Sequence, residues 1–197
     1  MALARLLTWR GLDFPRMELA EVERGPGGLA ARGVQIGTSG VAQGEGDGDA
    51  VDVPGRYRVD YELRTDAALV TTRIALTSRS DDGERRLELT RDTDGAWNAD
   101  AELPDLSGAL DCDLGLCPLT NFMPLQRENI TRGGEAKEFV MAWIVVPSLR
   151  VYRSEQRYEP IDASRVRYVG RHRSFEGELE LDEDGFVVLY PGLGERV

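Results

Sequence analysis

The alternation of apolar and charged side chains from Tyr57 to Arg64 constrains this chain more than any other feature. Tyr57, Val59, Tyr61 and Leu63 alternate with four charged residues. A repeat of two residues is the period of a β-strand, because successive side chains point to opposite faces. One apolar and one charged face are typical of an antiparallel sheet with one side in water. The alternation therefore predicts a sheet protein.

Similar patterns predict strands along most of the chain. They cover residues 69–77, 85–90, 138–146, 149–158, 165–173, 177–181 and 186–190. The segment 138–146 is apolar on both faces, so we expect a strand that is covered on both sides and ends at Pro147. Helical patterns are scarce. The chain thus predicts an all-β, mainly antiparallel fold in which a large curved sheet forms a half or a full barrel.

Two turns of similar sequence predict hairpins. Asp94-Gly95 joins residues 85–90 to a strand that carries Trp97, Ala99, Ala101 and Leu103 at alternate positions, and Asp184-Gly185 joins the last two predicted strands. Both residue types tolerate the backbone of a tight turn. We expect a single domain, residues 1–197. The similar sequences of the two turns suggest an internal duplication within it, with halves at residues 16–103 and 128–192.

Charge and length exclude several classes of function. The chain has 197 residues, a length that suits one domain, and a net charge of −11, which disfavours nucleic acid and anionic membrane surfaces. Its longest apolar run, Phe139 to Val146, is far shorter than the ~20 residues of a spanning helix, so we expect no stable membrane insertion. Arg5 and Arg10 interrupt a short N-terminal apolar stretch, which does not match a secretory signal. We expect a cytoplasmic protein.

The segment Leu110–Arg127 interrupts the strands and differs from them in composition. It combines carboxylates, thiols, prolines, an amide and a guanidinium with bulky apolar residues. Residues 119–125 predict a short helical turn, since Pro118 suits a first helical position and Pro124 would end the helix. A polar cluster within an apolar stretch is where we expect a binding site.

Two side-chain pairs in this segment allow more than one interpretation. Asp111 and Asp113 would project to the same side of an extended chain, as paired carboxylates or a metal site require, but aspartates also cap loops. Cys112 and Cys117 match no common zinc spacing, so we expect incidental thiols, with a redox pair as the alternative. We expect no catalytic residue, metal or cofactor.

Other polar features are better explained by structure. Gly37 to Asp52 predicts an acidic, solvated loop, because it lacks the ligand spacing of a calcium loop. The glycines at 25–28 predict a turn. His172, the single histidine, lies between two arginines, and we expect it on the surface. No phosphate-binding glycine loop and no serine nucleophile motif is present.

Aromatic residues on the predicted sheet include Tyr61, Trp97, Trp143 and Tyr190. Most aromatic side chains pack in a core, but aromatics on a curved sheet also accept the apolar faces of lipids or sugars. Arg73 interrupts a strand and would face either solvent or an anionic headgroup.

Short motifs in a fixed order resemble those of a bacterial family called the putative glycolipid-binding proteins. The most specific is C-D-L-G-x-C-P-x-T-N-x-x-P-L-x-R, from Cys112 to Arg127. The others are W-R-G at 9–11, T-x-R at 71–73, D-G-x-W at 94–97, A-W-I at 142–144, V-P-S-L-x-V at 146–151, Q-R-Y at 156–158 and Y-P-G-L at 190–193. The resemblance covers residues 8–197.

The resemblance implies a curved, incomplete barrel with an apolar cavity, similar in shape to bacterial lipoprotein carriers. It also implies pocket roles for five residues of the central segment: Asp111, Asp113, Thr120, Asn121 and Arg127. Two positions depart from the family pattern, Cys117 in place of a serine and Gly194 in place of an aromatic residue. The carriers are exported proteins, whereas this chain shows no export signal.

Three functions follow as hypotheses. The first is a non-catalytic protein that binds an amphiphilic, glycolipid-like molecule in a concave pocket, with Asp113, Asn121 and Arg127 at its polar part. The second is a hydrolase that uses Asp111 and Asp113 on a glycosidic or ester bond. The third is an interaction module without a small-molecule site, which a dry, filled interior would favour. The oligomeric state is left open.

Overall fold

The computed structural model describes residues 3–44, 49–171 and 174–197. Asp47 of the acidic loop and His172 lie outside the described residues. The described chain forms one sheet of 14 strands, in the order β7-β6-β5-β4-β3-β2-β1-β14-β13-β12-β11-β10-β9-β8. Every strand pairs antiparallel with its neighbours except β8, which is parallel to β9. The prediction of a large, mainly antiparallel curved sheet is confirmed.

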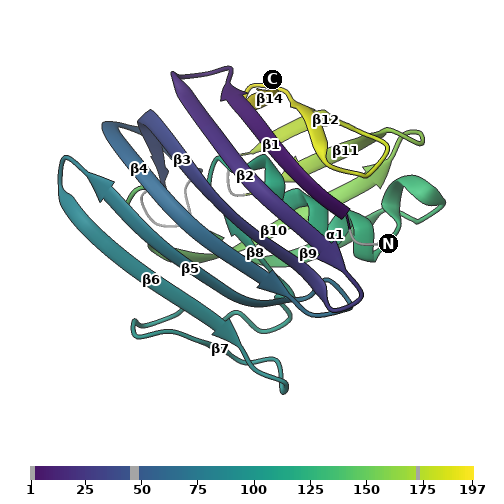
Figure 1. The fold of residues 1–197 in the computed structure, drawn as a ribbon, viewed down its shortest axis with the longest axis horizontal. Coiled ribbons are helices and arrows are strands. Elements are labelled where there is room, and N and C mark those ends of the chain that lie inside the picture. Colours follow the sequence, from purple (N-terminus) through teal and green to yellow (C-terminus); the bar gives the residue numbers. More distant parts are fainter. Residues whose placement is uncertain (1–2, 45–48, 172–173) are drawn as a thin grey trace.

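The N-terminal half of the chain supplies the first seven strands. They are β1 Leu3–Gly11, β2 Arg16–Gly25, β3 Gly28–Ala42, β4 Val51–Thr65, β5 Thr71–Ser80, β6 Gly83–Arg91 and β7 Trp97–Asn98. Each pairs with the next in sequence, so this part of the sheet is a simple meander. In Figure 1, β1 to β6 form the front layer of the molecule.

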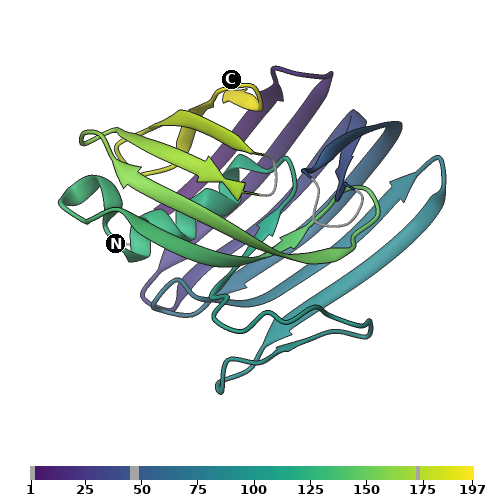
Figure 2. The same ribbon diagram turned by 180° about the vertical axis from the view of Figure 1, so that it is seen from behind.

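The C-terminal half supplies the other layer. It contains β8 Asp111–Leu114, β9 Lys137–Ile144, β10 Val151–Pro160, β11 Arg165–Gly170, β12 Phe175–Leu181, β13 Val187–Tyr190 and β14 Gly194–Arg196. Pairing of β14 with the C-terminal end of β1 joins the two meanders and places the last strand of the chain beside the first. Figure 2 shows β9, β10 and β11 crossing in front of the other layer when the molecule is seen from behind.

The sheet curves back on itself but does not close into a barrel. Where the β8 end of the sheet approaches β5, the Thr71 N–H donates to the Leu110 carbonyl, next to β8, at 3.0 Å. No strand ladder joins β5 to β8 in the described chain. β6 and β7 therefore extend past the point of closest approach, and β7 covers only Thr90 and Arg91 of β6.

The central segment, Leu110–Arg127, fills the space between the layers. After β8 come the 3₁₀ helix η1 Pro118–Asn121, the helix α1 Phe122–Arg127 and the 3₁₀ helix η2 Ile130–Arg132. Both views show α1 between the two layers. Phe122 stacks on Phe186 with ring centroids 4.2 Å apart, and Met123 is fully buried.

The predicted helical turn exists, but its predicted end at Pro124 is wrong. Pro124 is the third residue of α1. Amide groups in the first turn of a helix have no partner within the helix, so a proline there removes no hydrogen bond.

The predicted loop at 37–52 is wrong over much of its length. β3 continues to Ala42 and β4 begins at Val51, with Val41 opposite Asp52. The Val41 N–H donates to the Val146 carbonyl of the other layer at 2.6 Å. Gly40 is in contact with the same carbonyl, and a Cβ there would lie 2.3 Å from it. Docking against the second layer therefore stabilises strand structure that the glycines alone would not favour.

Both predicted hairpins are present, although the strand after Trp97 ends at Asn98. The carboxylate of Asp92 accepts the N–H groups two and four residues later, at 3.0 and 2.8 Å, and that of Asp182 does the same at 3.1 and 2.8 Å. Asp66 makes the same turn between β4 and β5, at 2.9 and 2.9 Å. Because this turn recurs within the first half, it does not mark a repeat, and the duplication stays a prediction.

Candidate functional site

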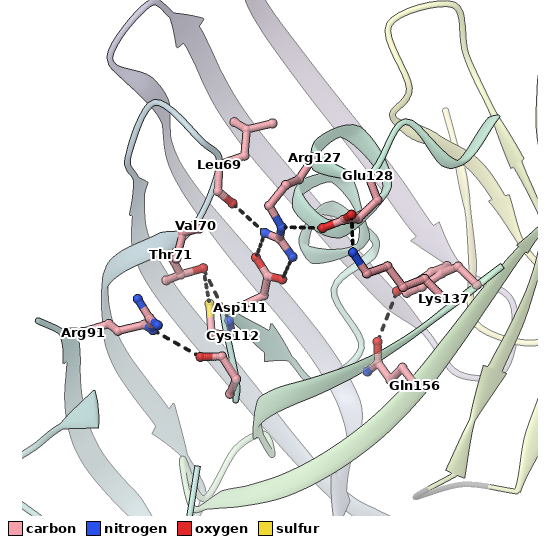
Figure 3. Close-up of polar contacts among 12 residues, drawn as sticks. Leu69, Val70, Thr71, Arg91, Asp111, Cys112, Arg127, Glu128, Lys137 and Gln156 are labelled. Atoms are coloured by element: carbon pink, nitrogen blue, oxygen red, sulfur yellow. Dashed lines mark hydrogen bonds and ion pairs between the residues drawn. The ribbon is translucent and has the colours of Figure 1, made fainter. Parts of the chain in front are cut away.

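Asp111 and Arg127 form a buried ion pair at the base of the central segment. The guanidinium contacts both carboxylate oxygens, at 2.8 and 2.5 Å, and the Arg127 Nη1 also donates to the Leu69 carbonyl at 3.1 Å. Figure 3 shows this bidentate ion pair, which joins β8 to the C-terminal end of α1. Burial raises the pKa of the Asp111 carboxyl, and Arg127 opposes that rise. The pair fixes the start of the segment to its end.

Further polar contacts extend the anchor on both sides. Arg127 also contacts Glu128 at 3.3 Å, and Glu128 pairs with Lys137 at the start of β9. On the other face of β8, the Cys112 N–H donates to the Thr71 hydroxyl at 3.4 Å (Figure 3). These contacts tie β8 to α1, β9 and β5.

Asp113 and Asn121 face the second layer of the sheet. The Gln156 amide of β10 donates to one Asp113 oxygen at 2.5 Å, and the Thr120 hydroxyl lies 3.1 Å from the other. The Tyr158 hydroxyl donates to the Asn121 side-chain oxygen at 2.7 Å. Both aspartates bind side chains, Asp111 that of Arg127 and Asp113 those of Thr120 and Gln156.

A small cavity lies beside this cluster. Its lining includes Asp113, Asn121, Trp143 and Tyr190, four of the residues predicted for the site, together with the Cys117 thiol. Its volume is about 30 Å³, which is room for about one water molecule. The interior of the molecule is otherwise filled by the central segment.

A second buried carboxylate, Glu18 of β2, was not predicted as a site residue. It is 2% exposed and lies opposite Gln35 of β3. The Tyr61 hydroxyl donates to its Oε1 at 2.8 Å, and the Cys117 thiol does so at 2.9 Å. Its Oε2 has no hydrogen-bond partner among the described residues. Burial raises the pKa of Glu18, while the hydrogen bonds from Cys117 and Tyr61 lower it.

Glu18 connects the tip of the central segment to the first layer. Gln35, its neighbour, accepts a hydrogen bond from the Tyr57 hydroxyl at 2.9 Å and donates to the Gly115 carbonyl at 3.4 Å. The sequence carries a signal for this region, because Gly33 and Gly37 lie directly opposite Tyr61 and Tyr57. A Cβ at Gly33 would lie 2.4 Å from the Tyr61 ring, so the absence of a side chain at the glycines leaves room for the tyrosine rings.

Both thiols are buried and reduced. Burial raises the pKa of Cys112 and of Cys117, and the adjacent Glu18 adds to the rise at Cys117. Thiolates are the reactive form of cysteine, so neither residue is in a setting that activates it. In the described part of the chain, no three metal-binding side chains come together.

Arg73 and Trp97 lie apart from the central cluster. Trp97 donates its indole N–H to the Ala109 carbonyl at 3.0 Å. Arg73 lies on the outer face of β5, where it contacts Glu88 at 2.8 Å and Glu62 at 3.2 Å. The structure thus brings together the predicted residues of the central segment with Trp143 and Tyr190, but not these two.

The outer face of β2 to β6 carries a groove of about 760 Å³, lined by Arg73 and by part of Tyr61. Ion pairs lie in it, such as Arg58–Asp60 along β4 at 2.5 Å. Arg58 lowers the pKa of Asp60, and Arg73 lowers that of Glu88, so these carboxylates are charged at neutral pH. Carboxylates accept and guanidinium groups donate, which together match the hydroxyl groups of a sugar.

One end of this groove is apolar. Leu19 and Val34 belong to its lining and lie directly opposite one another on β2 and β3. The next outward pair is Met17 and Ile36, which are 41% and 49% exposed. Leu19 is 38% exposed. The outer face therefore offers a polar groove next to an exposed aliphatic patch, formed by Met17, Leu19, Val34 and Ile36.

Fold and site define a class: an open, strongly curved antiparallel sheet whose interior is closed by an inserted helical segment. The model of a family described as "Putative glycolipid-binding" matches residues 6–196. The chain belongs to this family, as the sequence motifs predicted.

A solved structure shows the same fold. The crystal structure of a DUF1089 family protein from Pseudomonas aeruginosa is similar with a TM-score of 0.73 and 28% sequence identity, over 91% of this chain and 92% of that one. No curated protein matches this chain. The described residues form no helix that is long and apolar enough to cross a membrane.

Proposed function

We propose that this protein binds an amphiphilic, glycolipid-like molecule without transforming it. The observation that carries the proposal is the outer groove, where paired charges adjoin the aliphatic patch of Met17, Leu19, Val34 and Ile36. Its volume of about 760 Å³ lies within the ~300–1,000 Å³ of typical ligand sites. The family description names the same ligand class.

The polar part of the ligand would lie over Arg73 and its two carboxylate partners. Sugar hydroxyls both donate and accept hydrogen bonds, so they can bind Glu62 and Glu88 while accepting from Arg73. The aliphatic part would cover the exposed side chains of Met17 and Ile36, removing apolar surface from water.

The interior is the second candidate location. Asp113, Asn121, Trp143 and Tyr190 line the small cavity there. A ligand larger than water would enter only if the central segment moved, which would break the contact of Cys117 with Glu18. The predicted ligand-binding role of Asp111, Thr120 and Arg127 is part of this second location.

Calorimetry with dodecyl maltoside below its micelle concentration tests the proposal. Arg73→Ala should weaken binding about tenfold or more, because a charge-assisted hydrogen bond contributes ~1.5–3 kcal/mol. Leu19→Ser should also weaken it. Arg56→Ala is the matched control, since Arg56 is an exposed arginine paired with Asp81 outside the groove.

Two outcomes would change the assignment. If Asn121→Ala abolishes binding in a folded protein while Arg73→Ala has no effect, the ligand binds in the interior. If dodecyl maltoside binds nowhere, the filled interior favours the alternative of an interaction module. No observation supports the hydrolase alternative, because Asp111 is fully buried and paired with Arg127.

A further inference from the structure

A second groove, of about 600 Å³, lies where β6 extends past the rest of the sheet. Three segments form it: Arg85–Leu87 of β6, residues 101–103 after β7, and residues 148–152 at the turn from β9 to β10. In Figures 1 and 2, β6 and β7 project at the rim of the sheet. The groove shares no lining residue with the central cavity, but it adjoins the outer groove, with which it shares Arg86, Leu87 and Ala101.

Much of the lining is apolar. Leu87, Leu103, Leu149 and Val151 contribute aliphatic side chains, and Tyr152 contributes an aromatic ring. Tyr152 lies against Trp143 with ring centroids 5.8 Å apart, so its position is fixed by the core. A lining of this kind removes an aliphatic chain from water.

Three arginines line the groove, and two of them form no ion pair in the described part of the chain, whereas Arg86 pairs with Glu84. Among the described residues, neither Arg85 nor Arg150 has an ion pair or a side-chain hydrogen bond, although the chain carries an excess of carboxylates. The lining contains one carboxylate, Glu102, and it forms no ion pair with either arginine. Arg64 also forms no ion pair with the described residues, and it lies among Glu21, Glu23 and Glu62 on the outer face.

The strand next to Arg85 has an unsatisfied polar group. Ser78 of β5 lies directly opposite Arg85, and its buried hydroxyl has no hydrogen-bond partner in the described part of the chain. Buried hydroxyl groups in proteins usually have a partner. β7 pairs only with Thr90 and Arg91 of β6, so Arg85 and Leu87 lie at an edge of the sheet that no described strand covers. An unpaired buried hydroxyl on β5 therefore lies beside the position of Arg85.

We propose that this groove binds an aliphatic chain that ends in an anionic group, a carboxylate or a phosphate ester, with Arg85 and Arg150 binding the anion. Guanidinium groups bind both anions through two parallel hydrogen bonds. The site goes beyond the proposed glycolipid function, because it needs no sugar and none of the ion pairs of the outer groove.

Dodecanoate, titrated below its micelle concentration and followed by calorimetry, tests this site. Arg85→Gln and Arg150→Gln should each weaken binding about tenfold, since charge-assisted hydrogen bonds contribute that much. Arg64→Gln removes the same charge from an arginine outside the groove and should change binding less than about twofold. Thermal unfolding of each variant confirms that it folds, as expected for exposed side chains.

Two further measurements test the role of the aliphatic chain and the role of the two arginines separately. Inorganic phosphate alone should bind at least about tenfold more weakly than dodecanoate, because it lacks the chain. The Arg85→Gln/Arg150→Gln variant should retain its affinity for dodecyl maltoside, which keeps this result independent of the outer groove. The proposal is overturned if dodecanoate does not bind the native protein, if the double variant binds it equally, or if phosphate binds as tightly.

Discussion

Two buried carboxylates hold the central segment in place, and their surroundings differ. Asp111 contacts a guanidinium through both oxygens, at 2.8 and 2.5 Å. Glu18 accepts hydrogen bonds from a phenol and a thiol, and one of its oxygens has no partner among the described residues. Both are almost fully buried. They therefore allow a buried acid in contact with a cation to be compared with one whose hydrogen-bond donors are neutral.

The contrast lies in how the cost of burying each carboxylate is offset. Taking a carboxylate out of water is costly, and a bidentate guanidinium offsets that cost far better than neutral donors do. Asp111 can therefore remain charged next to Arg127, whose own pKa the carboxylate raises. Glu18 has no such contact, and burial raises its pKa. The first carboxylate is paired with a cation, whereas the second receives hydrogen bonds from neutral donors only.

Removing the cation should have the largest effect. Arg127→Ala leaves Asp111 buried without a partner, so we expect a loss of about 3–5 kcal/mol in the free energy of unfolding, measured by urea denaturation at pH 7. Arg127→Ala/Asp111→Asn should recover part of that loss, because no buried charge remains. A loss below about 1 kcal/mol in the single variant would show that Asp111 is not held as a charged anchor.

Glu18→Gln should increase the free energy of unfolding, whereas Arg127→Ala decreases it. A group whose pKa is raised by folding stabilises the protein below its unfolded pKa, near 4.5, and loses that stabilisation as pH rises through its folded pKa. Glutamine cannot ionise, so the variant should gain on the native protein above pH 4.5, by up to about 1.4 kcal/mol per pH unit. Urea denaturation between pH 4 and 8 measures the gain. Parallel curves for the two proteins would contradict a raised pKa.

Much of the fold could be predicted because strand alternation is a local property. The strands of residues 57–64 and 138–146 and both Asp-Gly hairpins follow from neighbouring side chains and turn chemistry. The extension of β3 to Ala42 could not be predicted, since it depends on the Val146 carbonyl, far away in sequence. Tertiary contacts override local preference at such positions.

The candidate site could be predicted only in part. The motif around Asp113 and Asn121 marks a real cluster, but its spacing does not reveal that Gln156 and Tyr158 would bind those groups. Glu18 was missed because the larger apolar residues of β2, Met17 and Leu19, lie on the outer face. Alternation gives the period of a strand, whereas the choice of inner face is made by the packing of the whole sheet.

The smallest expected effect concerns the donors to Glu18. Tyr61→Phe removes the hydroxyl that lies 2.8 Å from the carboxylate, and one such hydrogen bond contributes about 1 kcal/mol. Because this hydrogen bond lowers the pKa of Glu18, its loss should raise that pKa further and extend the pH range over which Glu18→Gln gains stability. Urea denaturation of the four proteins of the Tyr61→Phe/Glu18→Gln cycle across pH measures the coupling. Tyr152→Phe serves as the control, since its hydroxyl has no hydrogen bond to the described residues. If the two substitutions prove additive at every pH, the Tyr61 hydroxyl does not act on the charge state of Glu18.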